Sequence, residues 1–277
     1  MPHGRGLLAG KRVLVTGASG GLGAAIAKKL GSLDARVIVH YNTRHEGALA
    51  TAAAINAHPG DGACDGIVQC DFRDRGAIDA MWADVDAAWP DRALDVLVNN
   101  AGVVAKVAAD DDPRLAAWDE CLQINLHAPL QLALEARRRM VAGGGGGADR
   151  GCVVMISSIH GASSVEWMTA YAASKAALDR LTAGLSSEWA PDGVRVVGVA
   201  PGIVPVERTA EALATADAQA LWLPHLPVGR MGAADDVADA VAYVCDATWL
   251  SGSVLTLDGG MSARANMPRR PRPPRPE

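Results

Sequence analysis

Short runs of apolar, β-branched residues alternate along the chain with longer segments in which apolar residues recur at helical spacing. Because the strand-like runs are almost continuously apolar, we expect strands buried on both faces, as in a parallel sheet covered by helices. The predicted strands cover residues 12–16, 36–40, 66–70, 94–98, 152–157, 194–200 and 253–257. This alternation predicts an α/β fold with a doubly wound, seven-stranded parallel sheet and helices on both faces.

Two segments of low complexity stand outside this alternation. The run GGGGG at 143–147 is expected to be a flexible surface connection, because glycine loses much entropy in any regular structure. The tail PRRPRPPRPE at 268–277 can bury little apolar area and is expected to be disordered, with a hook for an anionic partner as the alternative. No linker interrupts the strand spacing, so we expect a single domain over residues 1–267.

The charge balance argues against a nucleic-acid partner. The 277 residues carry a formal charge of -5, and removing the tail leaves 22 basic and 30 acidic residues, a charge of -8. Proteins that bind nucleic acids usually carry a clustered basic excess instead. The partner that we expect is therefore a small molecule.

The cysteines and the apolar runs bear on the compartment. The five cysteines are odd in number and form no CxxC pair, which suits reduced thiols and predicts neither a disulfide framework nor a metal site. No apolar run approaches the ~20 residues of a membrane span, and the N-terminal apolar run is too short for a signal peptide. We expect a cytoplasmic protein without a membrane partner.

The segment VLVTGASGGLGAAIAKKL reads as a strand, a glycine-rich turn and a helix, with Gly17, Gly21 and Gly23 in the pattern T-G-x-x-x-G-x-G. Glycines there allow a tight turn and let the backbone approach a pyrophosphate, while the helix N-terminus supplies free N–H groups. A tight connection without a ligand is the alternative for such a turn alone. Its place between a strand and an amphipathic helix favours dinucleotide binding.

Together with NNAG at 99–102 and YAASK at 171–175, this glycine pattern resembles the short-chain dehydrogenase/reductase family. The resemblance runs from about Lys11 to Ser262, and points to the compact single-domain Rossmann branch with 3-oxoacyl-carrier-protein reductases and sugar dehydrogenases. It implies a nicotinamide cofactor. The residues that it implies for cofactor binding are Gly17, Ser19, Gly21, Leu22, Gly23, Asn42, Thr43, Arg44, Asp71, Phe72, Asn99, Ala101, Gly102, Tyr171, Lys175, Pro201, Gly202 and Val204.

The end of the second predicted strand, VIVHYNTRHEG, bears on which cofactor is used. An NAD enzyme of this type places an acid there to bind the ribose hydroxyls. From His40 to His45 there is none, whereas Asn42, Thr43 and Arg44 offer donors and one cation suited to a 2'-phosphate. We expect a preference for NADP(H), with NAD(H) possible; a simple solvated role for Arg44 is the alternative.

Further along the chain, the resemblance assigns Asp71 to the adenine amine and Phe72 to a backbone contact. The sequence alone also allows Asp71 to be the N-cap of the following helix. Pro201, Gly202 and the backbone of Val204 are expected beside the nicotinamide carboxamide. Pro205 departs from the family pattern, in which a Thr often offers a hydroxyl at this position, so the carboxamide contacts are left open.

The pair Tyr171 and Lys175 is four residues apart, and would therefore lie on one face of a helix. Reducing a carbonyl by hydride transfer needs a proton donor, and a nearby ammonium lowers a phenol's pKa so that it can act near neutrality. Ser158, in the loop after the fifth strand, would hydrogen-bond the substrate oxygen. The resemblance adds Asn125, which kinks its helix in the family and holds a water of a proton relay to Lys175.

The substrate end is less specified. Residues 205–231 are expected to form a mobile lid, and Ser158, Trp167 and Tyr171 to meet the substrate. Val103, Val104, His160, Met168 and Ile203 are further wall candidates and suggest a partly apolar carbonyl compound, although such residues also serve in packing.

The predicted function is that of an NADPH-dependent oxidoreductase that reduces a ketone or aldehyde to an alcohol, or the reverse. A sugar or polyol dehydrogenase is the alternative, and a non-catalytic nucleotide-sensing relative is the rival from another class. The resemblance also implies a homotetramer, or else a homodimer, built through the C-terminal helix and last strand and through the helices near 114–140 and 167–189.

Overall fold

The computed structural model describes residues 8–91, 93–111, 114–143, 149–207 and 209–263. Most of the glycine run and the whole Pro/Arg tail lie outside these residues. The elements in chain order are β1 (Arg12–Val15), α1 (Gly21–Ser32), β2 (Arg36–Tyr41), α2 (His45–Asn56), β3 (Ala63–Gln69), α3 (Arg75–Ala88), β4 (Val96–Asn99), α4 (Ala116–Leu122), a π-helical turn (Gln123–His127), α5 (Ala128–Ala142), β5 (Gly151–Ile156), α6 (Thr169–Trp189), β6 (Val194–Pro201), α7 (Ala210–Ala214), α8 (Ala216–Trp222), α9 (Ala234–Asp246) and β7 (Val254–Leu257).

The seven strands form one sheet in the order β3-β2-β1-β4-β5-β6-β7, and every neighbouring pair is parallel. This confirms the predicted doubly wound sheet. The strand β3 begins three residues earlier than predicted, because it pairs with β2 from Ala63 onward although Asp65 and Gly66 interrupt its apolar pattern. An edge strand tolerates such an interruption, since only one of its sides is paired.

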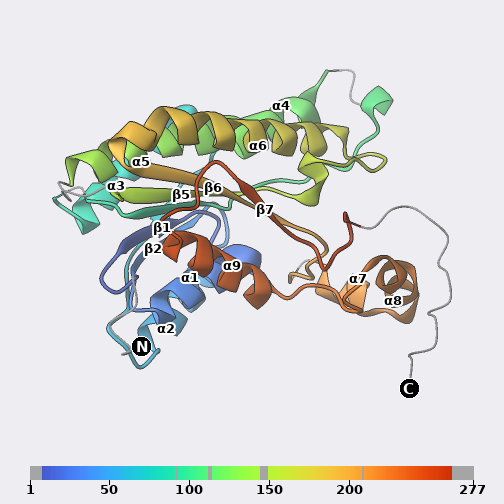
Figure 1. Cartoon of the computed structure of the whole chain (residues 1–277), viewed down its shortest axis with the longest axis horizontal. Coiled ribbons are helices and arrows are strands. Elements are labelled where there is room, and N and C mark those ends of the chain that lie inside the picture. The colour runs from blue at the N-terminus through green and yellow to red at the C-terminus, as the bar shows by residue number, and fades with distance from the viewer. Residues whose placement is uncertain (1–7, 92, 112–113, 144–148, 208, 264–277) are drawn as a thin grey trace.

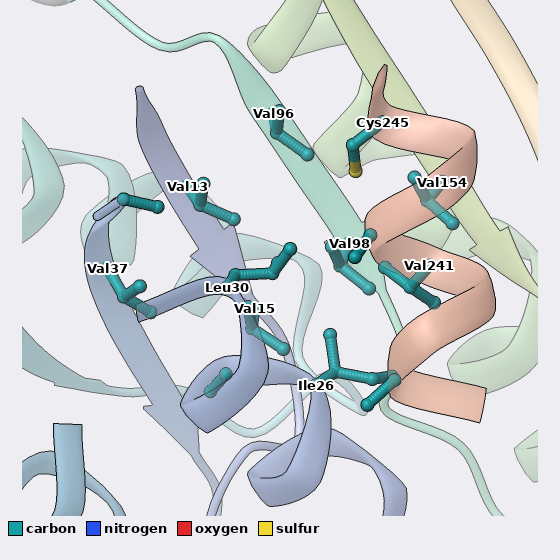
Figure 2. Packing of buried hydrophobic residues seen from close by; sticks show 14 of the residues in the cluster. Val13, Val15, Ile26, Leu30, Val37, Val96, Val98, Val154, Val241 and Cys245 are labelled. Carbon is teal, nitrogen blue, oxygen red and sulfur yellow. The ribbon is translucent and has the colours of Figure 1, made fainter. Parts of the chain in front are cut away.

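Helices cover both faces of the sheet (Figure 1), with α1, α2 and α9 on one face and α3, α5 and α6 on the other. Alternate residues of a strand point to opposite faces, so Val13 and Val15 of β1 pack in one core and Leu14 in the other. Figure 2 shows the first core, where Ile26 of α1 and Val241 of α9 pack against strand valines. Burial on both faces explains why the strands are almost continuously apolar.

The strand order reverses between β1 and β4: the two strands that follow β1 in the chain lie on one side of it in the sheet, and β4 and the later strands lie on the other side. In an open parallel sheet, ligands bind in the crevice that this reversal opens. The short helices α7 and α8 lie beyond this edge, outside the layered body (Figure 1). They fall within the segment that the sequence predicts as a lid.

Within the described ranges, no helix combines the length and the apolar character that a membrane crossing requires.

Candidate active site

A cleft of about 640 Å³ opens at the carboxyl ends of β1 and β4. The glycine loop forms one wall. Gly17 and Gly21 have φ angles of 65° and 56°, in the left-handed region that favours glycine. A Cβ on Gly23 would lie 2.3 Å from the carbonyl oxygen of Gly17, so only glycine permits this close approach of α1 to the loop. The cradle therefore has the shape that the glycine pattern predicts for a pyrophosphate.

The imidazole of His40 positions this loop by a hydrogen bond to its backbone. Its Nδ1 accepts the Gly17 N–H at 3.0 Å and its Nε2 lies 3.1 Å from the Cys70 carbonyl oxygen, which fixes the neutral Nε2–H tautomer. Burial lowers the pKa of His40 to about 4, and the ring stacks on Phe72 at 4.4 Å. Sequence reasoning missed this role of His40, because no short motif marks a buried histidine that positions a neighbouring loop.

Thr16 and Asn100 join the glycine loop to the NNAG turn. The Thr16 Oγ1 accepts the N–H groups of Asn100 and Ala101 at 2.9 and 3.0 Å, and the Asn100 amide donates to the Thr16 carbonyl at 2.8 Å. These bonds fix two cleft walls that are more than 80 residues apart in the sequence. Asn99, by contrast, does not line the cleft: its buried amide donates to the Pro129 carbonyl, since strand alternation turns it away.

At the far end of the cleft, Asn42, Thr43, Arg44, Asp71 and Phe72 line the walls. The Asp71 Oδ1 accepts both the backbone N–H and the Nε of Arg73 at 3.0 Å.

The N-cap of α3 is Asp74, whose side chain accepts the Gly76 N–H. The alternative of an N-cap role for Asp71 is therefore wrong, because the helix begins three residues later.

The predicted catalytic side chains meet at the near end. Tyr171 and Lys175 lie on successive turns of α6, and the Lys175 Nζ lies 5.7 Å from the centre of the Tyr171 ring. Ser158 precedes a short 3-10 turn and its Oγ accepts the His160 N–H at 3.2 Å. All three line the same cleft as the glycine loop.

Burial controls the charges of this group. It lowers the pKa of Lys175 to about 8, and Asp179 partly opposes that effect. Burial also raises the pKa of Tyr171, while a hydrogen bond with Ser158 lowers it. The sequence argument expected the ammonium to lower the phenol's pKa, but in this structure desolvation of the buried phenol outweighs its neighbours.

Asn125 lies in the π-helical turn between α4 and α5 and is fully buried. Its Oδ1 accepts the Val103 N–H at 2.9 Å, and its Nδ2 donates to the Val103 carbonyl at 2.9 Å and to the Ser174 Oγ at 3.0 Å. The expected distortion of the helix is present as this turn, a feature that often marks functional sites. The side chain bonds protein groups, so the water relay stays a prediction.

The substrate end is formed by fewer of the predicted residues. Val103 and Val104 line the cleft, whereas Trp167, His160, Met168 and Ile203 do not. Trp167 has a φ of 63°, unusual for a bulky residue, and its side chain is 63% exposed. Its carbonyl accepts the Val107 N–H at 2.9 Å, which ties this strained position to the segment after NNAG.

The other predicted cofactor residues line the cleft: Gly17, Ser19, Gly21, Leu22, Gly23, Ala101, Gly102, Tyr171, Lys175, Pro201, Gly202 and Val204. Val206, Glu207 and Thr209 also line it and were missed, because nothing in the sequence shows where the chain folds after β6. Among the described residues no group of three or more metal-ligating side chains gathers. The glycine cradle and the donors that line the cleft suit a dinucleotide.

The family described as short chain dehydrogenase matches this chain over residues 11–217. A 3beta-hydroxysteroid dehydrogenase 1 of Eggerthella lenta is 34% identical over 92% of this chain and 95% of its own length. A 2-dehydro-3-deoxy-D-gluconate 5-dehydrogenase of Pseudoalteromonas atlantica is 32% identical over 93% and 98%.

Solved structures show the same similarity. A short chain dehydrogenase from Burkholderia cenocepacia in complex with NADP superposes with a TM-score of 0.81 at 34% identity, covering 94% of this chain and 100% of its own. A gluconate 5-dehydrogenase from the same species, in complex with NADP and tartrate, has a TM-score of 0.81 at 25% identity, covering 93% and 97%.

Proposed function

Because this chain belongs to the short-chain dehydrogenase/reductase family, we propose that it interconverts an alcohol and a ketone or aldehyde with NADP(H) as the hydride carrier. One observation carries this proposal: Ser158, Tyr171 and Lys175 line the same cleft as the glycine loop. A non-catalytic nucleotide sensor has no need of all three chemical groups at one end of its nucleotide cleft.

The nicotinamide supplies or accepts the hydride when it is bound. Tyr171 donates the proton to the carbonyl oxygen in the reductive direction and takes it back in the oxidative one. Ser158 orients that oxygen by a hydrogen bond. The Lys175 ammonium uses one N–H for the Ile156 carbonyl, at 2.8 Å, and its charge stabilises the phenolate that forms on Tyr171.

The preference for the phosphorylated cofactor rests on the second strand. Arg44, Asn42 and Thr43 line the cleft at the end of β2, and the sequence from His40 to His45 contains no acidic residue. A guanidinium binds a phosphate with two parallel hydrogen bonds, which suits the 2'-phosphate. The relatives whose structures hold NADP support the same choice.

The substrate class has two candidates. Val103 and Val104 give the near end of the cleft an apolar wall, which favours an alicyclic or other partly apolar alcohol. A sugar acid is the second candidate, since several relatives are named for gluconate or its derivatives. A panel of both classes, followed by the absorbance of the reduced nicotinamide with each cofactor, separates the two.

The test of the mechanism is Tyr171→Phe, which removes only the phenol oxygen. We expect turnover to fall by about a thousandfold or more, because the proton donor is lost, while NADPH binding is kept. Turnover close to wild type in this variant would remove Tyr171 from the reaction. Higher kcat/KM with NADH than with NADPH would separately overturn the cofactor preference.

We also propose a homotetramer, with a homodimer as the alternative. Tyr243 of α9 is 61% exposed, and Trp249, between α9 and β7, is fully exposed. Large exposed aromatic side chains are candidates for an interface, and these two belong to the C-terminal helix and the loop before the last strand, where the family resemblance leads us to expect one. Light scattering that shows only a monomer would contradict both states.

A further inference from the structure

The turn that follows β6 rests on the glycine loop. In this turn the Thr209 N–H donates to the Val206 carbonyl at 2.7 Å. The Val206 side chain packs over the loop. Its Cγ1 lies 3.5 Å from the position that a Cβ on Gly21 would occupy. This turn therefore brings its second residue, Glu207, to the N-terminus of α1.

The carboxylate of Glu207 bonds two donors that face the cleft. Its Oε2 lies 2.7 Å from the Arg44 Nη1, and its Oε1 accepts the Gly21 N–H at 3.4 Å. A Cβ on Gly20 would lie 2.1 Å from the Arg44 Nη2 and 2.5 Å from the Glu207 Oε2. The ion pair thus packs directly on the backbone of Gly20, and a larger residue there would displace it.

Glu207 is an anion in this position. Its hydrogen bond with Arg44 and the Gly21 N–H hold the pKa of the carboxyl below its usual range. Both side chains of the pair are about half exposed, at 51% for Arg44 and 61% for Glu207. Solvent screens such a pair, so a stronger anion can replace the carboxylate at modest cost.

The two donors are those that a phosphorylated dinucleotide needs. The N–H groups of the first turn of a helix after a glycine loop bind a pyrophosphate. Arg44 is the cation expected to bind the 2'-phosphate. A carboxylate and a phosphate repel each other, and the same hydrogen-bond directions cannot serve both.

We propose that Glu207 is an internal competitor for the phosphate groups of the cofactor, and that its carboxylate leaves Arg44 and the Gly21 N–H when NADP(H) binds. This rests on the proposed function. The competition weakens the binding of either nicotinamide dinucleotide at Gly21, and weakens NADP(H) further at Arg44. Glu207, in the segment after β6, therefore helps to determine both the affinity for the cofactor and the selectivity between NADP(H) and NAD(H).

The same contacts also allow the opposite role, in which Glu207 keeps its bond to Arg44 across the bound dinucleotide and so clamps the cofactor. The two roles differ in the sign of one measurement. Glu207→Gln removes the charge and keeps the size of the side chain. If Glu207 is a competitor, Glu207→Gln binds NADPH more tightly than the wild type. If Glu207 is a clamp, Glu207→Gln binds NADPH more weakly.

The experiment measures the Kd of NADPH and of NADH by calorimetry for the wild type and Glu207→Gln at low salt. We expect Glu207→Gln to bind NADPH about 2- to 5-fold tighter, in the range of an exposed ion pair, with a smaller gain for NADH. The matched control is Glu211→Gln, an exposed glutamate in the first turn of α7, which should leave both constants unchanged. In an Arg44→Ala background, the gains for NADPH and NADH should become equal.

Unchanged or weaker NADPH binding by Glu207→Gln, while the wild type binds NADPH, would overturn the competitor and leave the proposed function standing. A gain as large in Glu211→Gln would also overturn it, because the effect would then be one of net charge. A wild type that binds neither dinucleotide would instead overturn the proposed function itself.

Discussion

Replacing Lys175 by methionine should stabilise the fold near neutral pH while it removes activity. The lysine side chain is 4% exposed, and its ammonium has no carboxylate within ion-pair distance among the described residues. Its Nζ donates to the Ile156 carbonyl at 2.8 Å. Methionine fills a similar volume without a charge, so Lys175→Met relieves the cost of burying an ammonium.

The size of the effect follows from the pKa of Lys175, which burial lowers from 10.5 to about 8. Since each pKa unit corresponds to about 1.4 kcal/mol, charging this lysine costs the folded state about 3 kcal/mol at about pH 7. The variant leaves the Ile156 carbonyl without this donor, which costs about 1 to 2 kcal/mol. We expect a net gain of about 1 to 2 kcal/mol in the free energy of unfolding.

The pH dependence isolates this cause. The folded-state pKa lies below the unfolded one, so between pH 8 and 10.5 the unfolded chain binds more protons at this site and the wild type gains stability as pH rises. The cost is fully present below pH 8 and about 2 kcal/mol of it is relieved by about pH 9.5. The advantage of Lys175→Met should therefore vanish across this window.

Urea unfolding at about pH 7 and at about pH 9.5 measures the difference in the free energy of unfolding between variant and wild type. The contributions of the other titrating groups cancel in this difference. Lys28→Met changes an exposed lysine of α1 and should shift the free energy of unfolding by under about 0.5 kcal/mol at both pH values. A Lys175→Met protein that is less stable at neutral pH, or an advantage independent of pH, would refute the claim that the ammonium is costly in the fold.

Three further substitutions test other parts of the structure. Gly23→Ala places a Cβ 2.3 Å from the Gly17 carbonyl oxygen, so we expect NADPH affinity to fall at least about tenfold in a fluorescence titration. Arg195→Met removes a buried guanidinium that donates to the last carbonyls of α9, and should cost about 3 kcal/mol in urea unfolding. Asp236→Ala removes a carboxylate that accepts the Ala233 N–H and pairs with Arg230. These bonds lower the pKa of Asp236 to about 2, so the stabilisation is present above its ordinary pKa and is lost as pH falls toward 2. The variant should lose about 1 kcal/mol in the free energy of unfolding at neutral pH. In thermal melts its stability should also depend less on pH in the acid range.

The sheet was predictable because its signal is local. Each strand is buried on both faces, so Val13, Leu14 and Val15 are all apolar and mark β1 without reference to any other segment. The glycine loop was predictable for a similar reason, since the steric need at Gly23 involves a residue only six positions away. Motifs of this kind carry their own structural context in the sequence.

The missed residues depend on long-range geometry. His40 acts on Gly17 through the pairing of β1 with β2, and Glu207 reaches Gly21 across 186 positions. Neither partner is visible from local spacing. Trp167 shows the converse: its place beside the YAASK motif suggested a pocket wall, but a left-handed backbone at this position accompanies a side chain that is mostly exposed and outside the cleft lining.

The π-helical turn places a buried amide, that of Asn125, next to the helix that carries the buried Lys175 ammonium. Within this turn, both polar ends of the Asn125 amide bond the Val103 backbone. The same amide bonds the Ser174 Oγ, and Ser174 precedes Lys175 on α6. Asn125 thus ties the chain after NNAG to the helix that carries the lysine. Since Lys175 lies in an environment that disfavours its charge, its position must be set by neighbours that are themselves fully bonded.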